Sequence, residues 1–225
     1  MPISEVYNCD CLEYMRSLPD KHFDLCIADP PYGIGVTKMT LGNGKNKVNR
    51  GLSDWDNRAP SPECFNELLR VSKNAIIWGA NHFISKLPYD SSCWIVWDKG
   101  TGSNDFADCE LAWTSFHKTV RKYFQSWVGA NAKEKTDKQR IHPTQKPIAL
   151  YAWLLDNYAM GGGKIFDPFL GSGSSRIAAY KKGYDFYACE LDKDYFDAQE
   201  ARFRKECLGE IRCSGVEVIT QKSLF

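Results

Sequence analysis

The sequence carries almost no net charge and has no apolar run long enough to cross a membrane. Its 225 residues include 29 Lys and Arg against 28 Asp and Glu, a net charge of +1. The whole chain therefore shows no charge excess that would mark a polyionic partner. A membrane helix needs about 20 successive apolar residues, and the N-terminus lacks the pattern of a secretory signal peptide. These absences predict a cytoplasmic protein that does not enter a membrane.

The sequence also lacks the cysteine pairs of a structural zinc site. It has nine cysteines, an odd number, and no C-x-x-C pair among them. Because zinc sites usually use such pairs, we expect no metal ion. Several cysteines, such as Cys26 and Cys93, lie inside apolar runs, where a thiol behaves as a small hydrophobic group. Thiols of this kind are typical of a reducing compartment.

Short apolar runs alternate with helix-like segments along the chain. We expect strands at 6–7, 25–28, 74–81, 93–99, 110–117, 164–169 and 185–191. We expect helices over 11–18, 65–72, 174–182 and 193–211, and a further helix opened by 144–147. This alternation indicates an α/β fold with a mainly parallel sheet, in which ligands bind at the carboxyl ends of strands. The length suits one domain, with 37–60 and 118–140 as insertions.

A glycine turn follows the strand at 164–169, in the segment KIFDPFLGSGSS (164–175). Glycines allow a close approach of backbone and ligand, and Glu190, at the end of the next strand, can accept two ribose hydroxyls. The third glycine of a dinucleotide site is missing, and Asp167 would repel a pyrophosphate. A cofactor with a free ammonium group would be attracted instead. The segment therefore favours S-adenosylmethionine over a nicotinamide dinucleotide.

The strand at 25–28 ends in Asp29-Pro30-Pro31-Tyr32, an unusual turn for a buried strand. The Asp29 carboxylate and the Pro30 carbonyl are hydrogen-bond acceptors, while the two prolines lack N–H donors and stiffen the turn. Two acceptors beside an aromatic ring suit a planar base with an exocyclic amine. They would stabilise the charge that develops on the amine during its alkylation. A plain loop is the alternative for this turn taken alone.

In these motifs the chain resembles the DNA amino-methyltransferases. Residues 29–32 resemble their catalytic motif, residues 167–173 their cofactor motif, and HPTQKP (142–147) the segment before the cofactor motif in the β-type order. The resemblance implies a Rossmann-like S-adenosylmethionine-dependent methyltransferase fold: a seven-stranded mixed sheet with one antiparallel strand and helices on both faces. It also implies methyl transfer from S-adenosyl-L-methionine to the N6 amine of an adenine flipped out of double-stranded DNA.

The resemblance assigns roles to the matching residues. The catalytic residues would be Asp29, Pro30, Pro31 and Tyr32. The cofactor-binding residues would be Asp10, Cys11, Thr144, Lys146, Asp167, Phe169, Gly171, Ser172, Gly173 and Glu190. Within this set, Asp10 and Cys11 would contact the adenine ring of the cofactor, and Thr144 and Lys146 its methionine carboxylate. Helix capping by Thr144 and a solvated position for Lys146 remain open, and His82 is expected to pack structurally.

Two basic segments, 37–50 and 117–140, are candidates for contacts with DNA phosphates, although solvated loops are the alternative. The candidate DNA-binding residues are Lys38, Lys45, Lys47, Arg50, Arg121 and Lys122. Because the second segment is short for a recognition region, we expect a short or loosely specified target sequence. A homodimer and a partner restriction endonuclease are further candidate partners that the family resemblance raises.

Other readings of the function remain open. Cytosine N4 is an amine that suits the same acceptors, but Asp29 at the first motif position favours adenine, since the family mostly uses Ser there for cytosine. RNA or a protein side-chain amide are further candidate substrates, and enzymes acting on protein amides tend to have Asn at that position. A catalytically inactive DNA-binding module is the alternative outside the enzymes.

Overall fold

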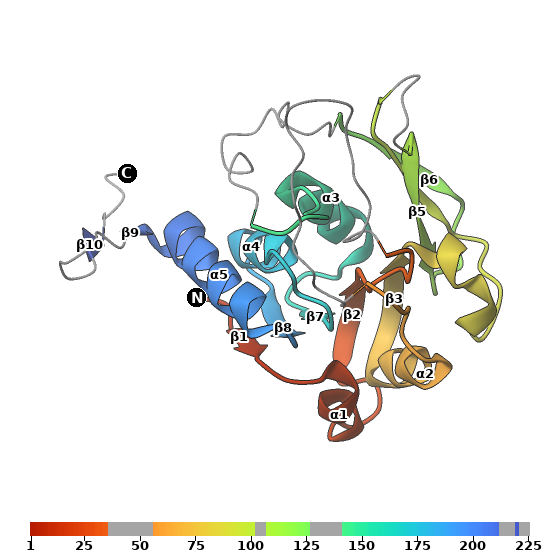
Figure 1. Ribbon diagram of the computed structural model, residues 1–225, viewed down its shortest axis with the longest axis horizontal. Coiled ribbons are helices and arrows are strands. Elements are labelled where there is room, and N and C mark those ends of the chain that lie inside the picture. Colours follow the sequence, from red (N-terminus) through yellow and green to blue (C-terminus); the bar gives the residue numbers. More distant parts are fainter. Residues whose placement is uncertain (36–55, 102–106, 127–140, 212–218, 221–225) are drawn as a thin grey trace.

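The structure is a computed structural model that describes residues 1–35, 56–101, 107–126, 141–211 and 219–220 (Figure 1). Within these residues, eight strands form one sheet in the order β1-β8-β7-β2-β3-β5-β4-β6. The strands are β1 (Ser4–Tyr7), β2 (Phe23–Ala28), β3 (Ser72–Trp78), β4 (Ile95–Asp98), β5 (Cys109–Thr114), β6 (Arg121–Phe124), β7 (Lys164–Asp167) and β8 (Asp185–Cys189). A separate antiparallel pair joins β9 (Glu210–Ile211) to β10 (Ile219–Thr220).

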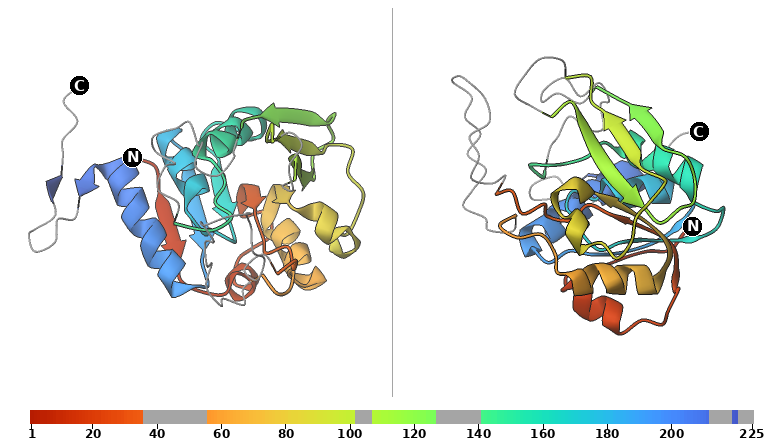
Figure 2. Two further views of the ribbon diagram at one scale, coloured as in Figure 1. Left: turned by 45° about the horizontal axis from the view of Figure 1, so that its top comes forward. Right: turned by 90° about the vertical axis from the view of Figure 1, so that its right-hand side faces the viewer.

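Helices cover both faces of the sheet, as the two views of Figure 2 show. The α-helices are α1 (Cys11–Arg16), α2 (Pro62–Val71), α3 (Ile148–Tyr158), α4 (Ser174–Lys181) and α5 (Lys193–Phe203). Short 3₁₀ turns η2 (Ala80–His82) and η3 (Ile84–Lys86) follow β3, and a π-helical segment, η6 (Arg204–Leu208), continues α5. No helix in the described ranges is long and apolar enough to span a membrane.

The alternation of side chains along β2 and β3 divides the core into two parts. Leu25 and Ile27 pack with α3 and α4 on one face of the sheet. Cys26 and Ala28 face the other side, where α1 and α2 pack. The central strands are thus buried on both faces, as expected for parallel strands. Their polar residues are accordingly confined to the strand ends.

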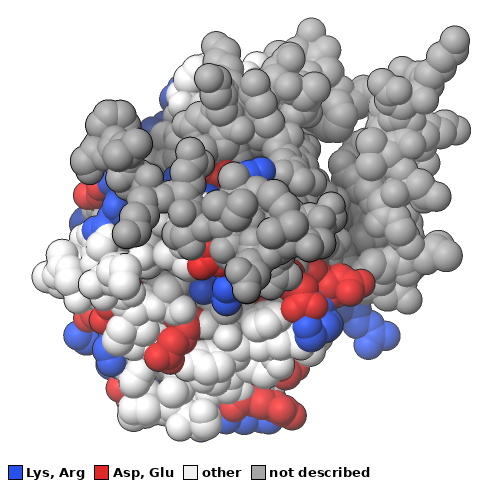
Figure 3. Space-filling model, turned by 90° about the vertical axis from the view of Figure 1, so that its left-hand side faces the viewer, with Lys and Arg blue, Asp and Glu red and all other residues white. Residues whose placement is uncertain are grey.

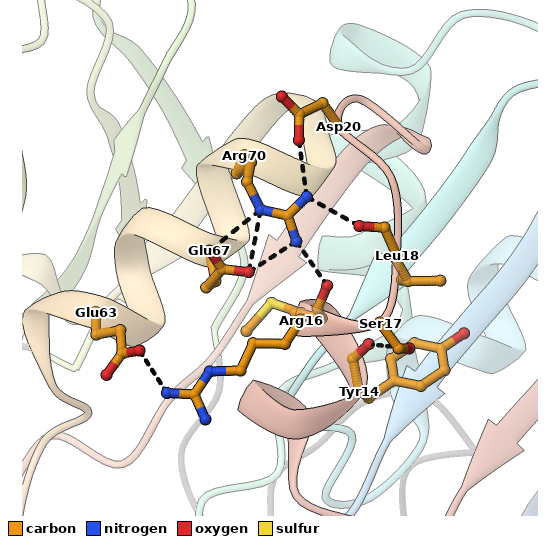
Figure 4. Close-up of polar contacts among 9 residues, drawn as sticks. Tyr14, Arg16, Ser17, Leu18, Asp20, Glu63, Glu67 and Arg70 are labelled. Atoms are coloured by element: carbon orange, nitrogen blue, oxygen red, sulfur yellow. Dashed lines mark hydrogen bonds and ion pairs between the residues drawn. The ribbon is translucent and has the colours of Figure 1, made fainter.

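Helix α2 is fixed to α1 by a hydrogen-bond network around Arg70 (Figure 4). Its guanidinium donates to Glu67 within the same helix and to the backbone carbonyls of Met15 and Leu18. The helix begins where Ser61 accepts a hydrogen bond from the Cys64 amide, followed by proline at the first helical position. The helix predicted over 65–72 is thus present, and it begins earlier, at Pro62.

All seven predicted strands are present, and the predicted fold class is confirmed, but the predicted strand number is wrong by one. The sheet contains an additional edge strand, β6, inside the segment predicted to be an insertion. Its sequence, Arg-Lys-Tyr-Phe, is mostly exposed and lacks an alternation of apolar and polar residues, so periodicity gave no strand signal. Residues 37–55 and 127–140 of the predicted insertions lie outside the described residues.

Strand β5 is antiparallel to both of its neighbours, β3 and β4. The parallel strands present their carboxyl ends at one edge of the sheet, and an antiparallel strand presents its amino-terminal residues there. Residues that follow β1, β8, β7, β2, β3 and β4 therefore meet residues that begin β5. The candidate active site lies at this edge.

Candidate active site

The turn after β2 presents Asp29 and Tyr32 together. The Tyr32 hydroxyl lies 3.0 Å from Asp29 Oδ1 and 3.3 Å from Glu110 Oε2, each of which can accept its proton. Pro30 is buried, so the turn packs against the core. The structure thus brings together the two side chains of the predicted catalytic motif.

Asp56 fixes the backbone of this turn, and sequence reasoning missed it. Its Oδ1 accepts hydrogen bonds from the amides of Tyr32 (2.7 Å) and Gly33 (3.0 Å), and its side chain is buried. A lone aspartate 24 residues from its partner gives no local sequence signal. Through these two hydrogen bonds, Asp56 holds the backbone of residues 32–33 in place.

Gly79, directly after β3, makes room for the Tyr32 ring. A Cβ atom at position 79 would lie 2.1 Å from Tyr32 Cε1, and the glycine has a left-handed φ of +69°. His82 stacks on the same ring, with centroids 5.2 Å apart and an interplanar angle of 19°. His82 therefore packs structurally, as expected, and the ring on which it packs is that of Tyr32 in the candidate site. A base that stacked on the Tyr32 ring face covered by His82 would have to displace the His82 side chain.

Lys146 lies at the centre of a charge cluster. Its Nζ lies 2.6 Å from Asp29 Oδ1 and 3.0 Å from Glu110 Oε2, and its side chain is 4% exposed. Lys99 forms an ion pair with the other oxygen of Glu110. The solvated alternative for Lys146 is therefore wrong. The cluster Asp29, Lys146, Glu110 and Lys99 holds two cations and two carboxylates, and its formal charges cancel.

The cluster sets the ionisation of its two carboxyl groups in opposite directions. Burial raises the pKa of Asp29 and the Glu110 charge adds to this rise, while Lys146 opposes it. Burial also acts to raise the pKa of Glu110, but Lys146 and Lys99 outweigh it and lower that pKa to about 2. The pKa of Lys146 is lowered by burial but raised overall by the two carboxylates. Glu110 is therefore the permanent anion of the cluster.

The predicted cofactor residues gather at the ends of β7 and β8. Asp167, the last residue of β7, is buried and accepts hydrogen bonds from the Phe169 amide (2.9 Å) and the Ser175 hydroxyl (2.5 Å). Glu190, directly after β8, accepts one from the Gly171 amide (2.7 Å). The two carboxylates thus shape the glycine turn from both sides.

The glycine turn supports a cofactor with a cation better than one with phosphates. Gly171 and Gly173 have φ of +51° and +73°, a conformation that favours glycine. Burial, together with the Asp29 and Glu190 charges, raises the pKa of Asp167 to about 7, against the opposing hydrogen bonds from Ser175 and Phe169. A buried carboxyl group with a raised pKa gains most from a cationic partner. These residues fit the ammonium and ribose of S-adenosylmethionine.

Arg202 supports the turn from α5 and gave no signal in the sequence. Its guanidinium donates to the Ser172 carbonyl (2.8 Å) and to the Ser174 hydroxyl (2.9 Å), and the side chain is buried. An arginine inside an amphipathic helix usually marks a solvated face, so sequence reasoning did not single it out. It fixes the carbonyl between the two glycines.

The other predicted cofactor residues lie nearby, in local roles of their own. Asp10 caps α1 by accepting hydrogen bonds from the amides of Leu12 and Glu13, and Cys11 is the first residue of that helix. Thr144 does not cap a helix, because α3 begins at Ile148 with Pro147 as its N-cap. Its hydroxyl lies 3.1 Å from His142 Nδ1 instead. The capping alternative for Thr144 is therefore wrong.

Two of the predicted DNA-binding residues are described, and both lie on the exposed edge strand β6. Arg121 is exposed, and Lys122 reaches Asp98 at 3.3 Å while remaining 65% exposed. Lys38, Lys45, Lys47 and Arg50 lie outside the described residues. On the face seen in Figure 3, the described basic and acidic side chains are interspersed and form no extended field of one sign.

Comparison with known proteins shows that the chain is similar to DNA methylases. The family model described as DNA methylase, of the N6/N4 type, matches residues 104–201. The chain is 23% identical to the type II methyltransferase M2.MboI of Moraxella bovis, over 89% of this chain and 87% of the relative. It is also 23% identical to the type II methyltransferase M.HinfI of Haemophilus influenzae, over 90% and 69% of the two chains.

Solved structures share the fold at low sequence identity. A DNA modification methylase of Thermus thermophilus, TTHA0409, complexed with S-adenosyl-L-methionine, superposes with a TM-score of 0.58 at 19% identity, covering 92% of this chain and 97% of the other. The PvuII DNA methyltransferase, described as cytosine-N4-specific, superposes with a TM-score of 0.57 at 13% identity, covering 96% and 89%.

The predicted resemblance to the DNA amino-methyltransferases is confirmed: the DNA methylase model matches residues 104–201, and two type II methyltransferases match about nine tenths of the chain. The predicted cofactor, S-adenosylmethionine, is the one bound in two of the solved structural neighbours, TTHA0409 and M1.HpyAVI.

Proposed function

We propose that this protein transfers a methyl group from S-adenosylmethionine to the exocyclic N6 amine of an adenine flipped out of double-stranded DNA. The observation that carries the proposal is the position of Asp29 beside the glycine turn. Strands β2 and β7 pair in parallel register, Cys26 with Phe166, so the residues that follow them meet at one edge. An amine held at Asp29 would therefore lie next to a cofactor held at Asp167.

The residues of the turn would act on the amine. S-adenosylmethionine supplies an electrophilic methyl group on a sulfonium centre. Asp29 and the Pro30 carbonyl would accept the two N–H bonds of the amine, directing its lone pair at that methyl group. As the N–C bond forms and the S–C bond breaks, positive charge would develop on nitrogen, where the Asp29 carboxylate would stabilise it. The cofactor would leave as a neutral thioether, and loss of one proton to water would give the neutral methylated amine.

The cofactor would lie along the glycine turn. We assign the ammonium group to Asp167, the ribose hydroxyls to Glu190, and the adenine ring to the segment at Asp10 and Cys11. Phe169, Gly171, Ser172 and Gly173 would line the methionine part. Glu190 uses both carboxylate oxygens for backbone amides of Gly171 and Asp192, yet each oxygen has a second lone pair for a ribose hydroxyl.

DNA is the proposed substrate, and the basic segments 37–50 and 118–140 are its proposed contact regions within a single catalytic domain. Arg121 and Lys122 on β6 support this assignment, because they are exposed and basic. On the basis of the family resemblance, we also propose a homodimer and a partner restriction endonuclease. The shortness of the second segment supports a short target sequence, which mapping of modified sites in a random-sequence duplex library would test.

Cytosine N4 is the second candidate target, since a structural neighbour is described as cytosine-N4-specific. The decisive experiment incubates the purified protein with duplex DNA and S-adenosylmethionine labelled in the methyl group, then digests the DNA to nucleosides. N6-methyladenine is the expected product. N4-methylcytosine would replace the adenine assignment. If the DNA carries no label while RNA or protein offered in parallel reactions does, the proposed substrate class is rejected.

A further inference from the structure

Lys146 has no N–H donor left for a cofactor carboxylate. Its ammonium lies within hydrogen-bond distance of Asp29 Oδ1 (2.6 Å), Glu110 Oε2 (3.0 Å) and the Tyr32 hydroxyl (3.0 Å). An ammonium group has three N–H donors, so these contacts use all of them. A methionine carboxylate would have to displace one of these acceptors. The structure thus directs Lys146 toward the catalytic turn.

We propose that Glu110 and Lys146 are a positioning pair for Asp29: Glu110 holds the Lys146 ammonium, which in turn holds the Asp29 carboxylate ionised and oriented toward the target amine. This inference rests on the proposed function, in which Asp29 accepts the amine. Both Lys146 and Tyr32 contact Oδ1 of Asp29. We therefore assign the other oxygen, Oδ2, to the amine.

The geometry of the sheet explains why the pair comes from distant parts of the chain. Glu110 is the second residue of β5, and it is level with Trp97 of β4 in the antiparallel register. Because β5 runs against its neighbours, this amino-terminal residue lies at the edge where β2 delivers Asp29. Lys146 arrives from the segment that precedes α3 and packs between two rings, with Nζ 5.4 Å from the Tyr32 centroid and 5.6 Å from that of Trp78.

Glu110 has a second function in this arrangement, which is to cancel the lysine charge. A sulfonium cofactor is cationic, and an unbalanced ammonium beside the amine would repel it in a site of low dielectric constant. Glu110 neutralises Lys146, and Lys99 in turn pairs with Glu110. Counted together with Asp29, the two lysines and the two carboxylates sum to zero, so the cluster adds no net positive charge near the methyl donor.

The two residues of the pair act on the pKa of Asp29 with opposite sign, because one is a cation and the other an anion. The groups that influence Asp29 are Lys146, Glu110 on β5, Tyr32 in its own turn, Tyr151 on α3 and Asp167 on β7. Among these, Lys146 lowers the pKa of Asp29 and Glu110 raises it. Removing each charge separately should move the titration of Asp29 in opposite directions.

The test is a carbon-13 NMR titration of the full-length, cofactor-free protein labelled at aspartate carboxyl carbons, with Asp29→Asn used to assign the resonance. Lys146→Met should raise the pKa of Asp29 by roughly 1–3 units, the usual effect of losing a cation at contact distance. Glu110→Gln should lower it. Glu63→Gln, which removes an exposed carboxylate paired with Arg16, is the matched control and should leave it unchanged.

Kinetics on the same variants link the pair to the reaction. In single-turnover methyl transfer at saturating cofactor, the acidic limb of the pH profile should move up for Lys146→Met and down for Glu110→Gln. Lys146→Arg, which keeps the charge, should return the limb toward the wild-type position. Shifts of the same sign in both variants, or an unchanged Asp29 titration in Glu110→Gln, would overturn the proposal. If the wild-type protein fails to methylate DNA, the proposed function fails, while the NMR titration still tests the pair.

Discussion

Cofactor affinity should depend on pH through Asp167. This carboxyl group is 1% exposed, and burial is the main cause that raises its pKa to about 7. An ammonium group bound against it stabilises the ionised form and therefore lowers its pKa in the complex. The sign follows directly: binding is strongest when Asp167 is already ionised, above pH 7, and weakens as the pH falls below 7.

The size of the change in cofactor affinity follows from the Asp167 pKa of about 7. Below pH 7, each unit of pH should weaken S-adenosylmethionine binding about tenfold, or about 1.4 kcal/mol, because the site must first release one proton. Between pH 8 and pH 5 the dissociation constant should therefore rise by about two orders of magnitude. Near pH 6, binding should release close to one proton per cofactor.

Isothermal titration calorimetry between pH 5 and pH 8.5 measures both quantities, with two buffers of different ionisation enthalpy at pH 6 to count the protons. Asp167→Asn keeps the shape of the side chain and should give weak, nearly pH-independent binding. Glu190→Gln separates any contribution from that second carboxylate, whose pKa burial also raises. Wild-type affinity that is unchanged between pH 5 and pH 8, or that increases toward low pH, would refute the assignment of the ammonium to Asp167.

Further predictions concern the turn at 29–32 and the stability of the protein. Gly79→Ala places a Cβ 2.1 Å from the Tyr32 ring, so methyl transfer should fall about 100-fold at unchanged cofactor affinity. Gly162→Ala is the control for backbone strain, because Gly162 has a φ of +74° but open space where a Cβ would lie. Equal losses of activity in both variants would contradict the steric argument. Asp56→Ala leaves two amides without their acceptor and should lower the free energy of unfolding by roughly 1–3 kcal/mol in urea denaturation. Asp56→Asn keeps an acceptor oxygen, and it should lose less than half as much. Folding raises the pKa of Asp167, so the cofactor-free wild-type protein loses stability as the pH rises toward 7. Above pH 7, the free energy of unfolding of Asp167→Asn should therefore exceed that of the wild type, by at most about 4 kcal/mol. A variant less stable than the wild type at pH 8 would contradict this.

The sequence predicted those parts of the site that depend on neighbouring residues. The turn at 29–32 and the glycine turn at 171–173 are local motifs at strand ends, and the parallel register of β2 and β7 brings them together as expected. Strand β6 escaped prediction because its exposed, basic sequence has no apolar periodicity. Local sequence patterns thus located both turns of the proposed site, whereas the exposed edge strand β6 had no recognisable pattern.

Contacts between distant segments explain the remaining differences. Lys146 was placed near a helix start, but its environment is decided by Glu110 and Asp29, 36 and 117 residues away in the chain. Glu110 reaches the site because β5 is antiparallel, and that direction has no signature in the sequence of β5 itself. Asp56 and Gly79 act on the backbone and ring of Tyr32, and their roles appear when the strands are assembled.

One measurement tests the central claim most directly: methyl transfer to duplex DNA by wild-type protein and by Asp29→Ala, with cofactor affinity measured on the same samples. The proposed mechanism predicts labelled N6-methyladenine with the wild-type protein and, for Asp29→Ala, no detectable transfer at an unchanged affinity for S-adenosylmethionine. Transfer by Asp29→Ala at a rate close to that of the wild type would contradict the account.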